Sequence, residues 1–222
     1  MSDNTVVFVV DDDESVRKAL ARLISSVGLE VETFPTPKAF LAHRHPDRLG
    51  CIVLDLRMPG ASGLALQEEL ARSGADLPIL FLTGHADVPT SVRAMKAGAV
   101  DFLEKPLQDQ ELLDAIHRAL ARSRELQAAR AERERIERLV ATLTPREREV
   151  LALVVAGLPN KLVADRLGAS EKTIKVHRAR VMQKMRANSL ADLVRMAQAV
   201  GIQPQAGDLG KPGPKRRSSP RP

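Results

Sequence analysis

Short apolar runs alternate with longer amphipathic segments through the first half of the chain. The runs have the length and aliphatic character of buried strands and predict five of them, at Thr5–Val10, Glu30–Phe34, Cys51–Leu54, Ile79–Leu82 and Val100–Leu103. The segments between and after them have helical periodicity, which predicts helices near residues 15–27, 37–43, 64–73, 88–97 and from 108 onward. Strands that are apolar throughout and alternate with helices favour a parallel sheet covered by helices on both faces.

Five such βα units predict an α/β, flavodoxin-like (βα)5 domain with the strand order 2-1-3-4-5, which we place at residues 1–122. The last predicted helix continues beyond its core-facing residues. Residues 123–137 contain neither Gly nor Pro, and their only large apolar residues are Leu126 and Ile136. We therefore expect a solvated helical linker. A short coiled coil is the alternative, although Arg133 would interrupt its apolar stripe.

A small, all-helical second unit is predicted for residues 138–202. Thr144, Pro145 and Glu147 have the spacing of a capping box with proline in the first helical turn. Helices are expected near residues 145–155, 160–166, 171–185 and 190–200. The second and third of these helices form a helix-turn-helix pattern, in which the later helix can enter the major groove of DNA. Residues 203–222 are rich in Pro, Gly, Ser and basic residues, so we expect a disordered basic tail.

The charge of the chain is divided between its two halves. Residues 1–108 carry 11 Lys and Arg against 15 Asp and Glu, whereas residues 140–202 carry 11 against 5. This asymmetry favours an acidic domain that binds a metal ion and a basic domain that binds a polyanion such as DNA. Aromatic residues make up only 2% of the chain, which argues against stacking on single-stranded bases. No apolar stretch is long enough to span a membrane, and we expect a cytoplasmic protein without membrane contact.

Polar residues follow the apolar runs at the points where the strands should end. They are Asp11 with Asp12, Asp55, Thr83 and Lys105. The carboxyl ends of parallel strands meet at one edge of a sheet, so we expect these side chains to converge. Carboxylates are ligands for Mg²⁺, while a hydroxyl and an ammonium group bind phosphoryl oxygens. The set therefore predicts a phosphorylatable aspartate with one Mg²⁺ beside it.

Each of these residues also has an ordinary structural interpretation. The acids would be helix caps, Thr83 a strand-end residue and Lys105 a solvated side chain. Their combination in this strand order argues against all three interpretations. Pro106 permits a cis peptide bond that would turn Lys105 back toward the site, and Gly84 leaves room for a phosphoryl group beside Thr83.

Several segments of the first half resemble the two-component receiver domain. They are VVDDDE at 9–14, DLRMP at 55–59 followed by Gly63, TGH at 83–85 and FLEKP at 102–106. The resemblance covers roughly residues 5–122 and implies that Asp55 accepts a phosphoryl group from a sensor histidine kinase. It also implies a set of Mg²⁺ ligands: Asp11, Asp12, Asp55 and the backbone carbonyl of Arg57.

The same resemblance implies a switch that responds to the phosphoryl group. Thr83 and Lys105 would bind the phosphoryl oxygens, and the ring of Phe102 would be coupled to Thr83. The surface around residues 88–104 would then change shape. The added charge of about −1.5 to −2 is sufficient to attract a hydroxyl and an ammonium group.

The second unit resembles the LuxR/FixJ-type DNA-binding domain. The resemblance is carried by LTPRE at 143–147, VAGL at 155–158, NK at 160–161, LG at 167–168 and SEKTIKVH at 170–177. It implies base-edge contacts from Lys175 and Val176, and phosphate contacts from neighbouring side chains. The complete set predicted to bind DNA is Asn160, Lys161, Lys172, Thr173, Lys175, Val176, Arg178, Arg180 and Lys184. Pro159 and Ala179 depart from the family pattern, so no base preference is transferred.

These interpretations together predict a transcription regulator of the FixJ/NarL type rather than an enzyme. Its expected partners are a sensor histidine kinase, double-stranded promoter DNA and RNA polymerase, with a homodimer favoured by phosphorylation. No GxxxxGK segment is present, which excludes an ATPase that remodels the polymerase. An aspartate-nucleophile phosphatase would need Asp-x-Asp-x-Thr, which the DLRMP segment lacks. A DNA-binding protein whose receiver no longer responds to phosphate is the other alternative.

Overall fold

The chain folds into two compact units, of which the second begins at Arg130. The computed structural model describes residues 5–43, 48–84 and 88–202. The predicted tail, residues 203–222, lies outside the described residues.

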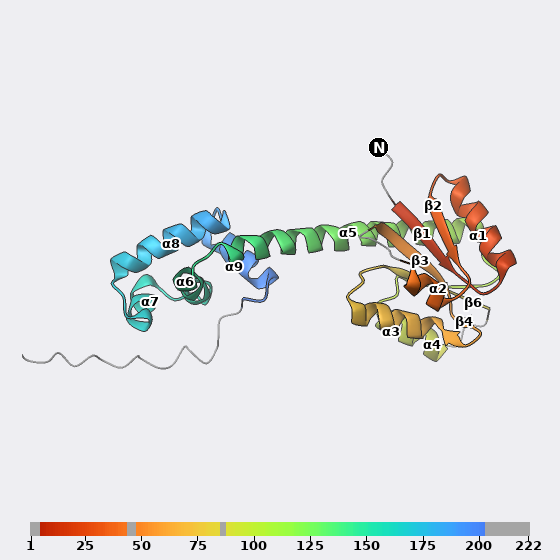
Figure 1. Ribbon diagram of the computed structural model, residues 1–222, viewed down its shortest axis with the longest axis horizontal. Helices are drawn as coiled ribbons and strands as arrows, with labels where there is room; N and C mark the ends of the chain where they lie inside the picture. Colours follow the sequence, from red (N-terminus) through yellow and green to blue (C-terminus); the bar gives the residue numbers. More distant parts are fainter. Residues whose placement is uncertain (1–4, 44–47, 85–87, 203–222) are drawn as a thin grey trace, which may run out of the picture. The chain divides into compact units, whose positions relative to one another are not determined.

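The first unit is built on a sheet of five parallel strands (Figure 1). The strands are β1 (Thr5–Val10), β2 (Glu30–Phe34), β3 (Leu49–Asp55), β6 (Ile79–Thr83) and β7 (Asp101–Glu104). Their order in the sheet is β2-β1-β3-β6-β7, and every neighbouring pair is parallel. This order is the predicted 2-1-3-4-5 arrangement, so the predicted flavodoxin-like fold is confirmed.

Helices cover both faces of this sheet because its strands present apolar side chains on both faces. In β1, the side chains of Val6, Phe8 and Val10 belong to one core cluster, and those of Val7 and Val9 belong to the other. The first cluster includes residues of α2 (Pro37–Ala42), α3 (Gly63–Ser73) and α4 (Val88–Lys96). The second includes residues of α1 (Glu14–Ser26) and α5 (Asp109–Ala141). The predicted parallel sheet with two covered faces is thus confirmed.

A short hairpin after β3 was not predicted. It pairs β4 (Arg57–Met58) with β5 (Ala61–Ser62) and leads directly into α3. Gly63 begins α3 so close to the sheet that a Cβ atom there would lie 2.6 Å from the Asp55 carbonyl oxygen. A glycine is therefore required for α3 to begin at this distance from the end of β3.

One edge of the sheet is formed by β2, which carries charged side chains. Arg48 donates to Glu32 over 2.7 Å and to Glu30 over 2.5 Å. His43 Nε2 lies 3.1 Å from the other oxygen of Glu32. Polar groups therefore line an edge strand whose backbone has a neighbour on one side only.

Helix α5 contributes to both units. Leu112, Ile116 and other residues of its first half pack on the sheet, while Ile136 is buried in the core of the second unit. Ser123 is also buried, and its hydroxyl accepts the N–H of Gly50 over 3.2 Å. The helix predicted for residues 123–137 is present, but its two ends are packed rather than solvated.

The second unit is helical, as predicted. Its helices are the end of α5 followed by α6 (Pro145–Val155), α7 (Asn160–Leu167), α8 (Glu171–Met185) and α9 (Leu190–Ala199). The predicted capping box of Thr144 and Glu147 is present at the start of α6. The side chains of Ser170 and Ser189 cap α8 and α9, whereas Pro159 gives α7 no side-chain cap. Gly168 turns the chain between α7 and α8 with a φ of 60°, which completes a helix-turn-helix.

Candidate functional site

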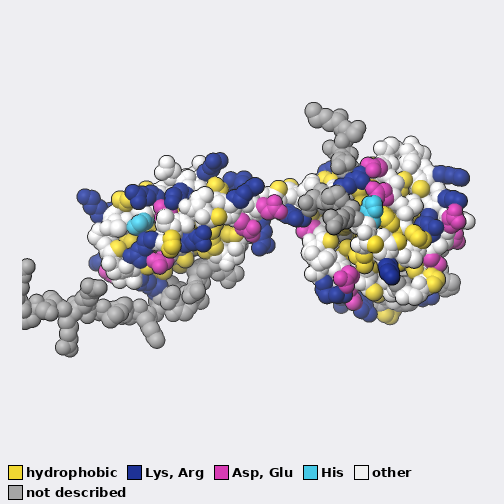
Figure 2. All heavy atoms as spheres, viewed as in Figure 1, with side chains coloured by type: hydrophobic (Ala, Val, Ile, Leu, Met, Phe, Trp, Pro, Cys, Tyr) yellow, Lys and Arg dark blue, Asp and Glu magenta, His cyan; other side chains and the backbone are white. Residues whose placement is uncertain are grey.

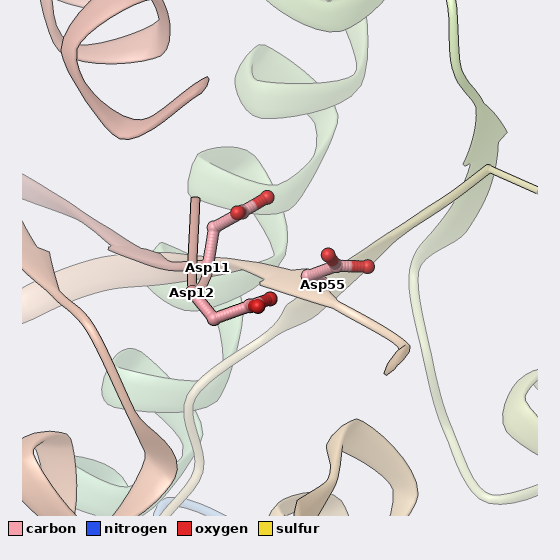
Figure 3. Close-up of side chains that lie close together, drawn as sticks. All are labelled: Asp11, Asp12 and Asp55. Atoms are coloured by element: carbon pink, nitrogen blue, oxygen red, sulfur yellow. The ribbon is translucent and has the colours of Figure 1, made fainter. Parts of the chain in front are cut away.

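Three carboxylates converge where two neighbouring strands end (Figure 3). Asp11 and Asp12 directly follow β1, and Asp55 is the last residue of β3, which pairs with β1. One oxygen from each carboxylate lies within 4.8 Å of the others. Asp11 and Asp55 are buried, whereas Asp12 is exposed. The sequence predicted this convergence, and the parallel pairing of β1 with β3 produces it.

Lys105 supplies positive charge to this acidic cluster from the end of β7. Its Nζ donates to Asp11 over 2.8 Å and to Asp55 over 3.2 Å. Its backbone N–H donates to the carbonyl of Thr83 over 2.7 Å, which fixes the point where the chain leaves the sheet. The Lys105–Pro106 peptide bond is cis, the isomer that Pro106 permits.

Burial and pairing have opposite effects on the protonation of these groups. Burial raises the pKa of the Asp55 carboxyl, and the positive charge of Lys105 offsets only part of that effect. Burial also opposes the charge of Lys105, but its hydrogen bonds and charge interactions with Asp11 and Asp55 outweigh burial and raise its pKa. The cluster therefore holds closely spaced acids that a single ammonium group does not fully compensate.

The acidic cluster has the donor chemistry of a magnesium site. All three candidate side-chain ligands are carboxylates, which hard divalent cations prefer, and no Cys or His belongs to the cluster of described residues. A divalent cation there would reduce the repulsion between the acids and would neutralise charge on an incoming phosphoryl group.

Several hydrogen bonds hold the acidic loop in place. Arg17, on α1, donates to the backbone carbonyl of Asp11 over 2.7 Å. The N–H of Asp13 donates to the Asp11 carboxylate over 2.8 Å, and the N–H of Arg57 donates to Asp55 over 3.3 Å. Sequence reasoning missed Arg17. Its signal was only a basic residue in the first turn of the helix that follows the acids.

The predicted switch residues lie at the same end of the sheet. Thr83 ends β6 and is fully buried. Phe102, on the neighbouring strand β7, is partly buried, and its ring centroid lies 6.2 Å from that of Phe81. Thr83 and Phe102 therefore lie on adjacent strands, with Phe102 turned toward the core cluster on the α3 and α4 face.

The helix-turn-helix presents a basic surface over α8 (Figure 2). Most of the predicted DNA-binding residues are exposed: Lys161, Lys172, Thr173, Lys175, Val176 and Arg180. Val176 is a large apolar residue with 46% of its surface exposed. Arg178 is partly buried and donates to Asn160 over 3.2 Å, which links α8 to the start of α7.

Lys184 differs from the other predicted DNA-binding residues. Its Nζ donates to the Glu147 carboxylate over 2.6 Å and to the Thr142 carbonyl over 3.2 Å. Glu147 is almost completely buried, so this ion pair lies against the core of the second unit. The sequence placed Lys184 on another face of the helix from Lys175, but it did not reveal this partner.

The fold and the site together define a class of protein. An acidic cluster in contact with a lysine, at the strand ends of a (βα)5 domain, is suited to hold a phosphorylated aspartate. The helix-turn-helix unit is suited to bind DNA. The class is a phosphorylation-controlled DNA-binding regulator. Within the part of the chain that the structure covers, no helix has the length and hydropathy needed to cross a membrane.

Comparison with known proteins identifies the family. Residues 7–117 match the response regulator receiver domain, and residues 141–197 match the family described as bacterial regulatory proteins, luxR family. Nodulation protein W of Bradyrhizobium diazoefficiens is 52% identical over 90% of this chain and 88% of its own length. FixJ of Rhizobium meliloti is 48% identical over 92% of this chain and 100% of its own length.

Solved structures give the same result. Response regulator StyR is 50% identical, covers 87% of this chain and 98% of its own, and superposes with a TM-score of 0.72. Full-length FixJ from B. japonicum is 43% identical over 89% of this chain and 97% of its own, with a TM-score of 0.53. The chain therefore belongs to the response regulators of the FixJ/NarL family. It is a phosphorylated response regulator that acts as a transcription regulator.

Proposed function

We propose that Asp55 is the phosphoryl acceptor and that a sensor histidine kinase is the donor. An Asp55 carboxylate oxygen forms a bond to phosphorus while the bond between phosphorus and the kinase histidine nitrogen breaks. That nitrogen leaves with the electron pair. The observation that carries this proposal is the position of Lys105, whose ammonium contacts both Asp11 and Asp55 at the strand ends.

The remaining site residues would support this transfer. We assign Mg²⁺ to Asp11, Asp12, Asp55 and the backbone carbonyl of Arg57; bound there, it supplies charge neutralisation for the phosphoryl oxygens. Thr83 and Lys105 would bind the phosphoryl group afterwards, since a hydroxyl and an ammonium group both donate to its oxygens.

The second unit would then recognise promoter DNA. Lys175 and Val176 on the exposed face of α8 would contact base edges, and Asn160, Lys161, Lys172, Thr173, Arg178 and Arg180 would contact or orient toward phosphates. We propose that Lys184 contributes less, because Glu147 already binds its ammonium group. The functional boundaries that we propose are residues 1–122, 123–137 and 138–202. Homodimers would match palindromic sites. At the promoter the regulator would recruit or block RNA polymerase. We propose that it acts in the cytoplasm.

Labelling with a small-molecule phosphodonor tests the acceptor. The full chain, incubated with acetyl phosphate and Mg²⁺, should gain the mass of one phosphoryl group. Asp55→Asn should gain none, whereas the exposed Asp76→Asn should behave as the original chain. Chelation of the divalent ion should suppress labelling. Undiminished labelling of Asp55→Asn would overturn the assignment.

DNA binding has a separate test. Lys175→Met should weaken binding to fragments selected from a random duplex library and change the bases that are selected. Lys172→Met should weaken binding to all fragments alike. It should also reduce the steepness of the plot of log affinity against log salt by about 0.9, as expected for one lost phosphate contact. Exposed Arg148 on α6 provides a matched control for loss of charge. Steady release of phosphate would instead favour a phosphatase, and binding that a phosphodonor does not change would favour an unresponsive receiver.

A further inference from the structure

A buried amide side chain connects α3 to the end of α4. Gln67 is 5% exposed and lies among the apolar residues of α3, with Leu66 and Leu70 beside it. Its Nε2 donates to the carbonyl of Ala94 and to the carbonyl of Ala97, each over 3.2 Å. A polar side chain in such a position must be explained by its partners, because buried amides are rarely left without hydrogen bonds.

The partners of Gln67 are carbonyls in the last turn of α4 and just beyond it. Helix C-termini leave carbonyls that no residue of the same helix satisfies, and donors from elsewhere can take them. The Ala94 carbonyl also accepts the N–H of Ala99 over 3.1 Å, at the turn that leads to β7. Gln67 therefore acts as a C-terminal cap of α4 that is supplied by the neighbouring helix.

The other end of the Gln67 amide is not satisfied. Its Oε1 is buried and has no hydrogen-bond partner within the described residues. The amide thus uses its donors on α4 and leaves its acceptor without a partner. The two hydrogen bonds hold the end of α4 against α3. The buried Oε1 lowers the stability of the fold, because a buried acceptor without a donor is unfavourable.

Gln67 lies one helical turn beyond Gly63, the residue of α3 that packs against Asp55. Gly63, four residues earlier on the same helix face, lies against the carbonyl of Asp55, and its N–H donates to the carbonyl of Leu56 over 3.0 Å. A displacement at the end of β3 would therefore shift the start of α3. Gln67 would transmit that shift to the end of α4 through its two hydrogen bonds.

We propose that Gln67 is a positioning residue that couples phosphorylation at Asp55 to α4 through α3. This coupling rests on the proposed function, because it requires Asp55 to be the acceptor. It adds a route across the helix layer to the coupling of Thr83 with Phe102 that the family resemblance implies. The effect is a coupling free energy between two places, so it is measured as a loss of response rather than a loss of phosphorylation.

The variant Gln67→Met tests the coupling, with Gln67→Leu as a second replacement. Both keep a side chain of similar volume and remove the unpartnered oxygen together with the donor. The Ala94 carbonyl retains the N–H of Ala99, and Ala97 is exposed, so its carbonyl can be hydrated. Both variants should therefore fold, which thermal unfolding of the full chain would check.

The measurement is hydrogen–deuterium exchange of the amides of residues 88–99, with and without acetyl phosphate and Mg²⁺. In the original chain, phosphorylation should change their exchange rates by at least about fivefold, the lower end of typical coupling. In the Gln67 variants the change should fall below about twofold, while phosphate incorporation stays within about twofold of the original. A structural role alone would alter exchange equally in both conditions.

Two variants are matched controls on the same helix. Glu68→Gln removes the exposed ion pair of Glu68 with Arg93, which also joins α3 to α4 over 2.7 Å. Leu70→Met alters buried packing without touching a polar group of α4. Both should keep the full response of α4 to phosphorylation.

The outcomes separate this inference from the proposed function. Full phosphate incorporation in the Gln67 variants with an undiminished response of α4 would overturn the coupling alone. A similar loss in Glu68→Gln would also overturn it, because any contact between the helices would then suffice. Absence of phosphate on the original chain, or labelling of Asp55→Asn equal to it, would overturn the proposed acceptor and the coupling with it.

Discussion

Lys184 Nζ donates to the Glu147 carboxylate over 2.6 Å and so joins the C-terminal half of α8 to the first turn of α6. The Glu147 side chain is only 3% exposed and also accepts the N–H of Thr144 over 2.8 Å. A buried carboxylate with two donors is stable, whereas the same group without its cation would be strongly disfavoured. This pair therefore fixes the C-terminal end of α8 against α6.

Replacement of Glu147 by Gln should lower the free energy of unfolding of the second unit by about 1.5–3 kcal/mol, the usual contribution of a hydrogen bond to a charged group. The replacement leaves the Lys184 ammonium without its carboxylate. Amide hydrogen exchange of α6 and α8 in the full chain would measure the change. Glu149→Gln removes only an exposed pair with Arg146 and should change stability by less than about 0.5 kcal/mol. Equal effects of the two replacements would contradict the structural role of the buried pair.

The same pair predicts a dependence on pH. The hydrogen bond from Lys184, followed by that from the Thr144 backbone, lowers the pKa of Glu147 from 4.5 to about 2. Because the folded pKa is lower than the unfolded one, the stabilisation is complete above about pH 4.5 and is lost as the pH falls toward 2. The difference in unfolding free energy between the original chain and Glu147→Gln should shrink over that interval. A difference that stays constant down to pH 2 would argue against the assignment.

Arg17→Met should reduce the affinity of the acidic site for Mg²⁺ by about tenfold, the lower range for residues that orient ligands. Arg17 holds the carbonyl of Asp11, so its loss would loosen the loop that carries two of the acids. The measurement is the Mg²⁺ concentration that gives half-maximal labelling by acetyl phosphate. Lys18→Met removes the exposed charge next in sequence, which pairs with Glu14, and should leave this concentration unchanged.

Arg186→Gly should stabilise the second unit by about 0.5–1 kcal/mol. Arg186 follows α8 with a φ of 54°, the left-handed conformation that side chains other than glycine adopt with strain. Thermal unfolding would detect the gain. Arg186→Ala removes the same charge but keeps a Cβ atom, so it should give no comparable gain. Equal stabilisation by both would assign the effect to charge instead of backbone conformation.

The fold was predictable because its central strands, β1, β3 and β6, are nearly continuous apolar runs, as a parallel sheet covered on both faces requires. Thr5–Val10 and Glu30–Phe34 were predicted at the observed bounds, and no end of the other three strands differs by more than two residues. The hairpin of β4 and β5 was missed because strands of two residues are too short to show a period. Helix caps such as Thr144 were recognised because their signal is local in sequence.

The convergence of the acidic site was also predictable, because it follows from strand order alone. The supporting contacts were not. Gln67 and Lys184 act through partners on other helices that are 27 and 37 residues away, and one sequence carries no information about those distances. Arg17 acts on a backbone carbonyl six residues earlier, a contact that leaves no pattern of residue types. Gln67 left a weak sign, a polar residue on the apolar face of α3 four positions after Gly63.

The charged border of β2 has a consequence for the behaviour of the chain at high concentration. An open strand edge is a template on which another molecule can add its own strand, which begins fibrillar association. Arg48 is hydrogen-bonded to both Glu30 and Glu32. An added strand would have to desolvate these three ionised groups. The β2 edge of the sheet is thereby protected against the addition of a strand from another copy of the regulator.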